Sequence, residues 1–246
     1  MNNQNSPKPI SKLALSGLVL SVAVIISALM SGVGYRLGWW RHPEAFSIFE
    51  WATYAGVVAV VISIIGVFKT RSQSQQRGLL PAIIGLVLSL PVISASLLFE
   101  YSATAYPQIN DITTDTQDPP SFWDVPNPIE YPGESVAEIQ LAAYPDLKPL
   151  ALSVTQEKAF EKALEIVTNK GWEVIASDVD EGRIEAVDTS LLFGFKDEVV
   201  VRVAESDEGS IIDIRSRSRI GRIDRGANAK RIRDYLKTLK QTTASL

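Results

Sequence analysis

Three long apolar stretches occupy most of the first hundred positions of the chain, at 13–34, 46–68 and 79–99. Each is close to the roughly 20 residues that an α-helix needs to cross about 30 Å of hydrocarbon. The only charged residue within them is Glu50, near one end of the second stretch. The pattern predicts three transmembrane helices, which together form a membrane anchor over residues 1–100.

The first apolar stretch follows Lys8 and Lys12, as the apolar segment of a secretory signal peptide follows its basic residues. Signal segments have about 7–15 apolar residues and end at a cleavage site with small side chains. Here the apolar run continues without interruption to Gly32 and Gly34. We therefore interpret it as a retained helix.

Small residues recur at helical spacing within the three stretches, and they allow membrane helices to approach closely. The pairs are Gly17 with Ser21, Gly56 with Ser63, and Gly85 with Ser89. Ion carriers and proton relays need ionisable groups at mid-membrane depth, and these stretches have none there. The pattern favours an anchor that packs on itself over a channel or a carrier.

The short loops predict the orientation of the anchor, because Lys and Arg are retained on the cytoplasmic side. The loop between the first two stretches has only Arg36 and Arg41 as basic residues. The amino terminus and the second loop together have five, Lys8, Lys12, Lys69, Arg71 and Arg77. This bias predicts an inner-membrane protein with a cytoplasmic amino terminus and a periplasmic carboxyl-terminal domain.

Residues 101–150, called the strap below, are rich in proline and acid and show neither helical nor strand periodicity. They carry eight acidic side chains and one basic one, Lys148. Their aromatic and aliphatic content is too high for a solvated linker, so we expect an ordered segment that lies on the domain behind it. Asp111, Asp115 and Asp118 are expected to cap turns, because the glycine and closing acid of a calcium loop are missing.

Residues 151–246 have the pattern of an extracytoplasmic α+β domain. Apolar residues recur at helical spacing between a predicted cap at Ser153 and a stop at Gly171, and a last helix is predicted over 227–239. Between these helices lie four alternating runs, at 172–179, 183–189, 198–205 and 210–219. Short polar separators join them as hairpins. We predict an antiparallel four-stranded sheet with two helices on one face.

Strand alternation places the charged side chains of these runs on the face away from the helices, where water, the strap or a ligand covers them. These side chains are Glu173, Glu185, Arg202, Asp213, Arg215 and Arg217. Basic residues are concentrated at the end of the chain, with ten basic and three acidic side chains in residues 211–246. The candidate ligand-binding residues are Arg202, Arg215, Arg217, Arg219, Arg222, Asp111 and Asp115.

Two interpretations of these arginines, besides catalysis, remain open at this stage. They pair with acids of the same chain, either across the sheet or from the strap, or their planar guanidinium groups bind a phosphate or a carboxylate. Catalysis is less favoured, because the only histidine, His42, lies at the membrane edge and no glycine-rich phosphate loop follows a strand. Cysteine is absent, which excludes disulfides and thiolate sites, and we predict no metal and no cofactor.

Four motifs resemble a bacterial and plastid family known as domain of unknown function 1499. They are INDITTDTQDPPSF, YPDLKPL, RIEAVDTSLLFGFKDEVVVRV and IDIRSRSRIGRIDRGANAKRIR, and the resemblance covers about residues 109–236. It implies a small protein associated with an envelope or thylakoid membrane, without an established activity, cofactor or catalytic residue. Many members carry His where this chain has Asn110.

We therefore predict an integral membrane protein that presents a periplasmic binding or scaffolding domain. Its expected partners are an anionic lipid, a cell-wall polymer or an envelope protein. Nucleic acid is not expected, because of the compartment and the net charge of −4. The alternative is an envelope hydrolase for a phospho- or ester compound, with Asp111 or Asp115 acting beside an arginine clamp.

Overall fold

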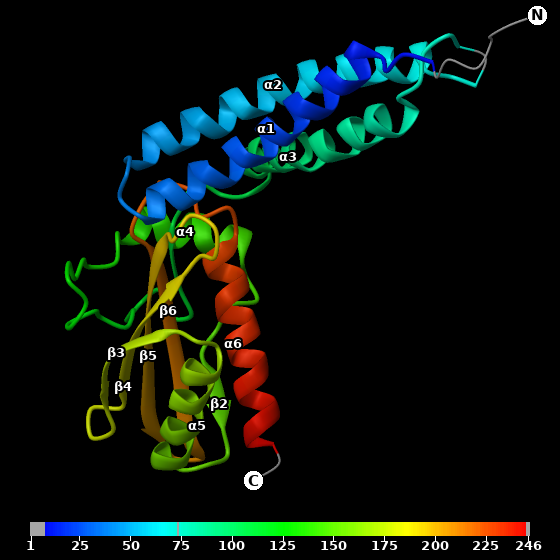
Figure 1. Ribbon diagram of the computed structural model, residues 1–246. Helices are drawn as coiled ribbons and strands as arrows, with labels where there is room; N and C mark the ends of the chain where they lie inside the picture. Colours follow the sequence, from blue (N-terminus) through cyan, green and yellow to red (C-terminus); the bar gives the residue numbers. More distant parts are fainter. Residues whose placement is uncertain (1–7, 73, 245–246) are drawn as a thin grey trace, which may run out of the picture. The chain divides into compact units, whose positions relative to one another are not determined.

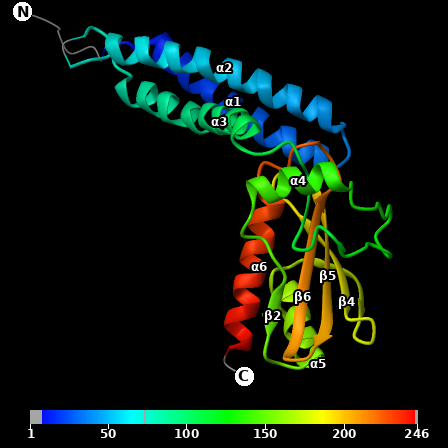
Figure 2. The same cartoon turned by 180° about the vertical axis from the view of Figure 1, so that it is seen from behind.

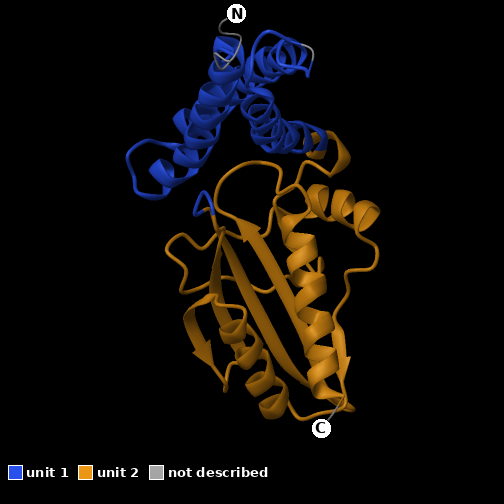
Figure 3. Cartoon of the chain, turned by 45° about the vertical axis from the view of Figure 1, so that its right-hand side comes forward, with its two compact units in different colours: residues 1–101, 192–194 blue, residues 102–191, 195–246 orange. Residues whose placement is uncertain are grey.

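The computed structural model describes residues 8–72 and 74–244. The chain divides into two compact units, which Figure 3 shows in different colours. One comprises residues 1–101 with 192–194, and the other comprises 102–191 with 195–246. Most of the strap therefore belongs to the same unit as the sheet.

Three long helices form most of the first unit: α1 (Lys12–Arg36), α2 (His42–Lys69) and α3 (Leu79–Ala105), coloured blue to green in Figure 1. All three are long and apolar enough to cross a membrane, which confirms the three predicted apolar helices. The side chain of Ser11 caps α1 by accepting a hydrogen bond from the Ala14 amide, and Pro43 lies in the first turn of α2. Proline is favoured there because the first amides of a helix have no partner within it.

Small residues bring the helices of the anchor into backbone contact. Ser21 Oγ donates a hydrogen bond to the carbonyl oxygen of Gly85 at 2.6 Å, and Ser89 Oγ donates to Ser21 Oγ at 2.9 Å. A Cβ atom added to Gly85 would lie 2.9 Å from the Leu18 amide nitrogen. The small-residue spacing therefore marks the helix contact, as predicted.

The second unit is built on an antiparallel sheet with the strand order β1-β6-β5-β4-β3, and β2 also pairs with β6. The strands are β1 (Asp111–Thr113), β2 (Leu150–Leu152), β3 (Glu173–Asp178), β4 (Arg183–Thr189), β5 (Lys196–Ser206) and β6 (Gly209–Ser218). The prediction of four strands was wrong, because β1 lies in the strap and β2 begins at the last residue of the strap, Leu150. Each has three residues, which is too short to produce a recognisable alternation.

Two helices, α5 (Gln156–Asn169) and α6 (Ala227–Thr243), cover one face of the sheet, as Figures 1 and 2 show. Their apolar sides form one core with the inward residues of the strands. Within this core, Tyr235 Oη donates to the Ala163 carbonyl at 3.0 Å. The two helices on one face confirm the prediction. The cap of α5 is Thr155 and not Ser153, because Thr155 Oγ1 accepts from the Lys158 amide.

A further helix that was not predicted, α4 (Glu134–Ala143), lies within the strap. Its Gln140 side chain is buried and replaces a neighbouring strand at the outer edge of β1. Gln140 Oε1 accepts from the Thr113 amide at 2.9 Å, and Gln140 Nε2 donates to the Thr113 carbonyl at 2.7 Å. Because both backbone groups of Thr113 are satisfied, the strap is fixed to the edge of the sheet.

The helix contact predicts different effects for two glycine substitutions. Gly85→Ala should destabilise the anchor by about 1–3 kcal/mol, because backbone atoms of α1 must move to make room. Gly56→Ala should change stability by less than about 0.5 kcal/mol, since its Cβ would meet the nearest heavy atom at 3.5 Å. Thermal unfolding of the full chain in detergent micelles, followed by circular dichroism, measures both. Equal losses would contradict close backbone packing at Gly85.

Candidate anion-binding site

The sheet face opposite α5 and α6 carries a layer of charged side chains, called the charged face below. Its members are Glu185, Glu198, Arg202, Asp213, Arg215 and Arg217, and all except Arg202 are less than one tenth exposed. Glu173, which was assigned to this face from the sequence, lies on the outer strand β3 and is exposed. The buried charges lie beneath the strap, so the strap and not water covers most of this face.

Arg215 lies at the centre of the charged face and is 1% exposed. Its Nε and Nη2 donate to the two carboxylate oxygens of Asp111 at 2.9 and 2.8 Å. Its Nη1 donates to the Pro120 carbonyl at 3.2 Å, and its Nη2 also donates to the Ile129 carbonyl at 2.9 Å. The Phe122 ring lies 4.8 Å from its Cζ. These contacts use Arg215 for attachment of the strap and leave little of it for a ligand.

Tyr131 lies beside the same ion pair, with its ring 5.6 Å from the Arg215 Cζ. Burial, and to a smaller extent the negative charge of Asp111, raises the pKa of Tyr131 to about 12. The phenol therefore stays neutral at physiological pH. It adds no charge to the buried pair.

Glu185 fixes the middle of the strap by its carboxylate. This group accepts hydrogen bonds from the amides of Trp123, Asp124 and Val125 at 2.6, 2.9 and 3.0 Å, and also pairs with Arg183. Charge-assisted hydrogen bonds to backbone amides are among the stronger ones in proteins. The sequence placed Glu185 on the face that water, the strap or a ligand covers, and in the structure it is a buried attachment point for the strap.

Arg202 and Asp115 are brought together, but in a turn rather than in a catalytic arrangement. Asp115 Oδ1 accepts from the amides of Gln117 and Asp118 at 2.9 and 3.0 Å, which is the turn-capping geometry that the sequence predicted. Arg202 contacts Asp118 at 2.7 Å, Asp213 at 3.1 Å and Asp115 at 3.5 Å. Burial lowers the pKa of Arg202, but the carboxylates of Asp213 and Asp118 outweigh burial and raise it overall.

Arg217 and Arg219 share one carboxylate, that of Glu198. Arg217 Nη2 pairs with Glu198 Oε2 and donates to the Asn127 carbonyl at 2.9 Å, while Arg219 Nε donates to Glu198 Oε1 at 2.8 Å. Nε and Nη1 of Arg217 are buried and have no hydrogen-bond partner among the described residues. The Arg219 side chain is 27% exposed. Arg222 is exposed and lies beyond the end of β6.

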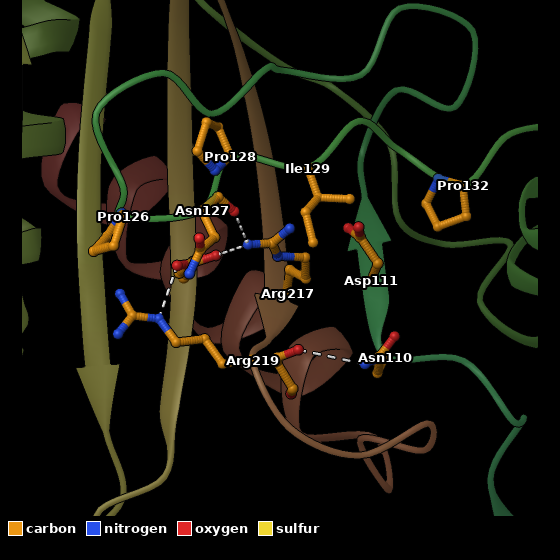
Figure 4. A pocket seen from close by; sticks show the side chains of 11 residues that line it. Asn110, Asp111, Pro126, Asn127, Pro128, Ile129, Pro132, Arg217 and Arg219 are labelled. Carbon is orange, nitrogen blue, oxygen red and sulfur yellow. Dashed lines mark hydrogen bonds and ion pairs between the residues drawn. The ribbon is translucent and has the colours of Figure 1, made fainter.

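A pocket of about 710 Å³ opens beside these two arginines, and Figure 4 shows its lining. One side is the end of β6 with Arg217, Ser218 and Arg219, and Glu198 of β5 lies next to it. The neighbouring strand β1, which pairs with β6, adds Asp111 and the preceding Asn110. The strap closes the pocket with Pro126, Asn127, Pro128, Ile129 and Pro132.

The charges around the pocket leave one positive charge. The guanidinium groups of Arg215, Arg217 and Arg219 are paired with the two carboxylates of Asp111 and Glu198. Such a pocket favours a singly charged anion, and a planar guanidinium group matches a carboxylate or phosphate. Across residues 8–72 and 74–244, no group of three or more His, Cys, Asp or Glu side chains is arranged to hold a metal.

The structure therefore separates the seven candidate residues. Arg217, Arg219 and Asp111 line one pocket, whereas Arg215 lies behind it, Arg202 and Asp115 belong to the turn, and Arg222 is outside. Sequence analysis missed Glu198, although strand register gave a signal: Glu198 has the same alternation as Arg202 and lies directly opposite Arg217. The strap wall of the pocket had no such signal, because its residues have no regular spacing.

A family model described as Protein of unknown function (DUF1499) matches residues 111–239. The match covers more than half of the chain, so the chain belongs to this family, as its four motifs indicated. It includes residues 111–150 of the strap, the charged face and nearly all of the pocket, and it leaves the three apolar helices outside. A search of curated proteins found no match.

The buried pair of Arg215 and Asp111 predicts a large effect for Asp111→Asn. The substitution leaves the buried guanidinium without its counter-ion and should destabilise the second unit by about 3–5 kcal/mol. Urea unfolding of the full chain, followed by tryptophan fluorescence, measures the loss.

The chain offers a matched control in Asp146, which binds Arg233 with the same two-oxygen geometry at 2.6 and 2.7 Å. Both side chains are about half exposed, so Asp146→Asn should cost less than about 1 kcal/mol. Similar losses for the two substitutions would show that burial of the Asp111 pair is unimportant.

Proposed function

We propose that this DUF1499 protein is a membrane-anchored binding module whose second unit holds a singly charged anion in the pocket between β6 and the strap. The observation that carries this proposal is Arg217, a buried guanidinium with two unpartnered N–H groups in the pocket lining. A buried donor without a partner costs about 1–3 kcal/mol. Oxygen atoms of an anion supply the missing acceptors.

The surroundings of Arg217 support binding of a ligand, because they hold the guanidinium group in a fixed orientation. Glu198 and the Asn127 carbonyl hold its Nη2 in place, so the guanidinium is oriented before the anion arrives. Arg219 is partly exposed and adds donors at the pocket entrance. Preorganised groups bind more tightly because little conformational freedom is lost on binding.

Binding is favoured over hydrolysis by the positions of the two aspartates. A catalytic carboxylate must be available to substrate or water as a base or a nucleophile. Both oxygens of Asp111 accept from Arg215, and Asp115 caps the strap turn. Neither is arranged to act on a phospho- or ester compound held by an arginine clamp.

We place the binding unit on the periplasmic side of an inner membrane, with an anionic lipid, a cell-wall polymer or an envelope protein as the partner. The three apolar helices support association with the membrane. The orientation rests on the five basic residues that lie on the amino-terminal side of the anchor and in its second loop.

Anion binding predicts a specific loss for Arg219→Gln. In wild type, dimethyl phosphate and acetate should raise the unfolding temperature of the full chain in phosphatidylcholine nanodiscs, because a ligand of the native state stabilises it. Arg219→Gln should weaken this binding by about tenfold or more, since it removes charged hydrogen-bond donors. Arg233→Gln, which removes the same charge away from the pocket, should respond as wild type. Equal responses of all three proteins would reject the pocket as the anion site.

The orientation predicts the activity of reporter fusions. Alkaline phosphatase fused after Leu246 should be active and green fluorescent protein at the same position dark, because the first reporter requires export and the second fails to mature after it. Fusions after Thr70, in the second loop, should give the reverse result. A fluorescent fusion after Leu246 would place the binding unit in the cytoplasm.

A further inference from the structure

The strap wall of the pocket is mostly apolar, and Asn127 is the one residue in it with a hydrogen-bonding side chain. Pro126, Pro128 and Pro132 have no backbone N–H, and all three are exposed. The carbonyl oxygens of Asn127 and Ile129 already accept from Arg217 and Arg215. The Ile129 side chain is 58% exposed. Figure 4 shows this wall beside Arg217 and across from Arg219.

A ligand in this pocket therefore meets two different environments. Its charged end can reach the donors of Arg217 and Arg219, while its remaining part lies against prolines and Ile129. Hydroxyl groups on that part would find few partners besides the Asn127 side chain, and unpaired polar groups weaken binding. Apolar groups would instead be removed from water.

The charge of the pocket limits the charged end to one negative charge. Glu198 and Asp111 line the pocket together with the arginines, and they repel any second charge on the ligand. The volume of about 710 Å³ lies within the range of pockets for small organic molecules, roughly 300–1,000 Å³. There is room for more than a lone inorganic ion.

We infer that the ligand is an amphiphilic monoanion, with a carboxylate or phosphodiester head on Arg217 and Arg219 and a short apolar body against the strap prolines and Ile129. This inference rests on the proposed function, because it assigns a ligand class to the same pocket. A free organic acid and the diester of an anionic lipid share this chemistry.

The test compares matched pairs of ligands by isothermal titration of the full chain in phosphatidylcholine nanodiscs, with empty nanodiscs as the blank. Acetate and hexanoate differ only in apolar length, as do dimethyl phosphate and dibutyl phosphate. The longer member of at least one pair should bind about tenfold more tightly, since each fully buried methylene strengthens binding by roughly fourfold. The tighter binder of the two short ligands, acetate and dimethyl phosphate, identifies the head group. Hexanamide, which has no charge, should not bind.

Two variants and one matched control assign the effect to the pocket. Arg219→Gln should weaken binding of all four anions. Ile129→Ser should reduce the advantage of the longer ligand at least threefold and leave acetate and dimethyl phosphate unchanged. Ile139→Ser changes an isoleucine of α4 that is 44% exposed and does not line the pocket, so it should have no effect.

The outcomes separate this inference from the proposed function. If short and long anions bind equally and Arg219→Gln still weakens them, the pocket binds anions and the amphiphilic ligand is rejected. Tighter binding of the dianion butyl phosphate than of dibutyl phosphate would also reject it, because the pocket would then favour a second charge. If no anion binds, or if Arg219→Gln has no effect, the proposed function fails as well.

Discussion

The ion pair between Arg215 and Asp111 is the interaction on which the arrangement of the second unit depends. Removing a guanidinium and a carboxylate from water costs several kcal/mol per ion, and their attraction offsets this only with good geometry and further hydrogen bonds. Here the pair has two parallel hydrogen bonds, two strap carbonyls and an aromatic ring around Arg215. The strap must therefore stay in place, because its contacts replace the water that the buried guanidinium group has lost.

This requirement gives the second unit three layers instead of two. Helices α5 and α6 cover one face of the sheet with an apolar core, and the strap covers the other by charged and backbone hydrogen bonds around Glu185 and Arg215. A small apolar cluster of Phe122, Val125 and Val200 fills the space between these attachments. A chain without cysteine holds an irregular segment of many prolines in this way, with buried polar contacts in the place of cross-links.

The same pairing also creates the pocket. Arg215 and Arg217 differ in their counter-ions. Arg215 has the carboxylate of Asp111 to itself, whereas Arg217 shares that of Glu198 with Arg219. Three guanidinium groups with two carboxylates leave one positive charge, and two Arg217 nitrogen atoms have no hydrogen-bond partner in the described part of the chain. The strap buries these charges, and its prolines form one wall of the pocket. The structural interpretation of the arginines thus describes Arg215, and the binding interpretation is proposed for Arg217 in the same strand.

The sequence by itself determined the three apolar helices, the four strands β3 to β6, the helices on one face and the charged character of the other face. These features follow from composition and from periods of 3.6 and 2, which are local properties of the chain. Only the tertiary structure decided which arginine is buried, that β1 and α4 form within the strap and β2 at its end, and that Glu198 completes the site. Arg215 and Asp111 are 104 positions apart, and a hydrogen bond over that separation leaves no periodic signal in either segment. The strap is held by contacts with the sheet and has no regular hydrophobic pattern of its own, so its structure could not be predicted from the sequence.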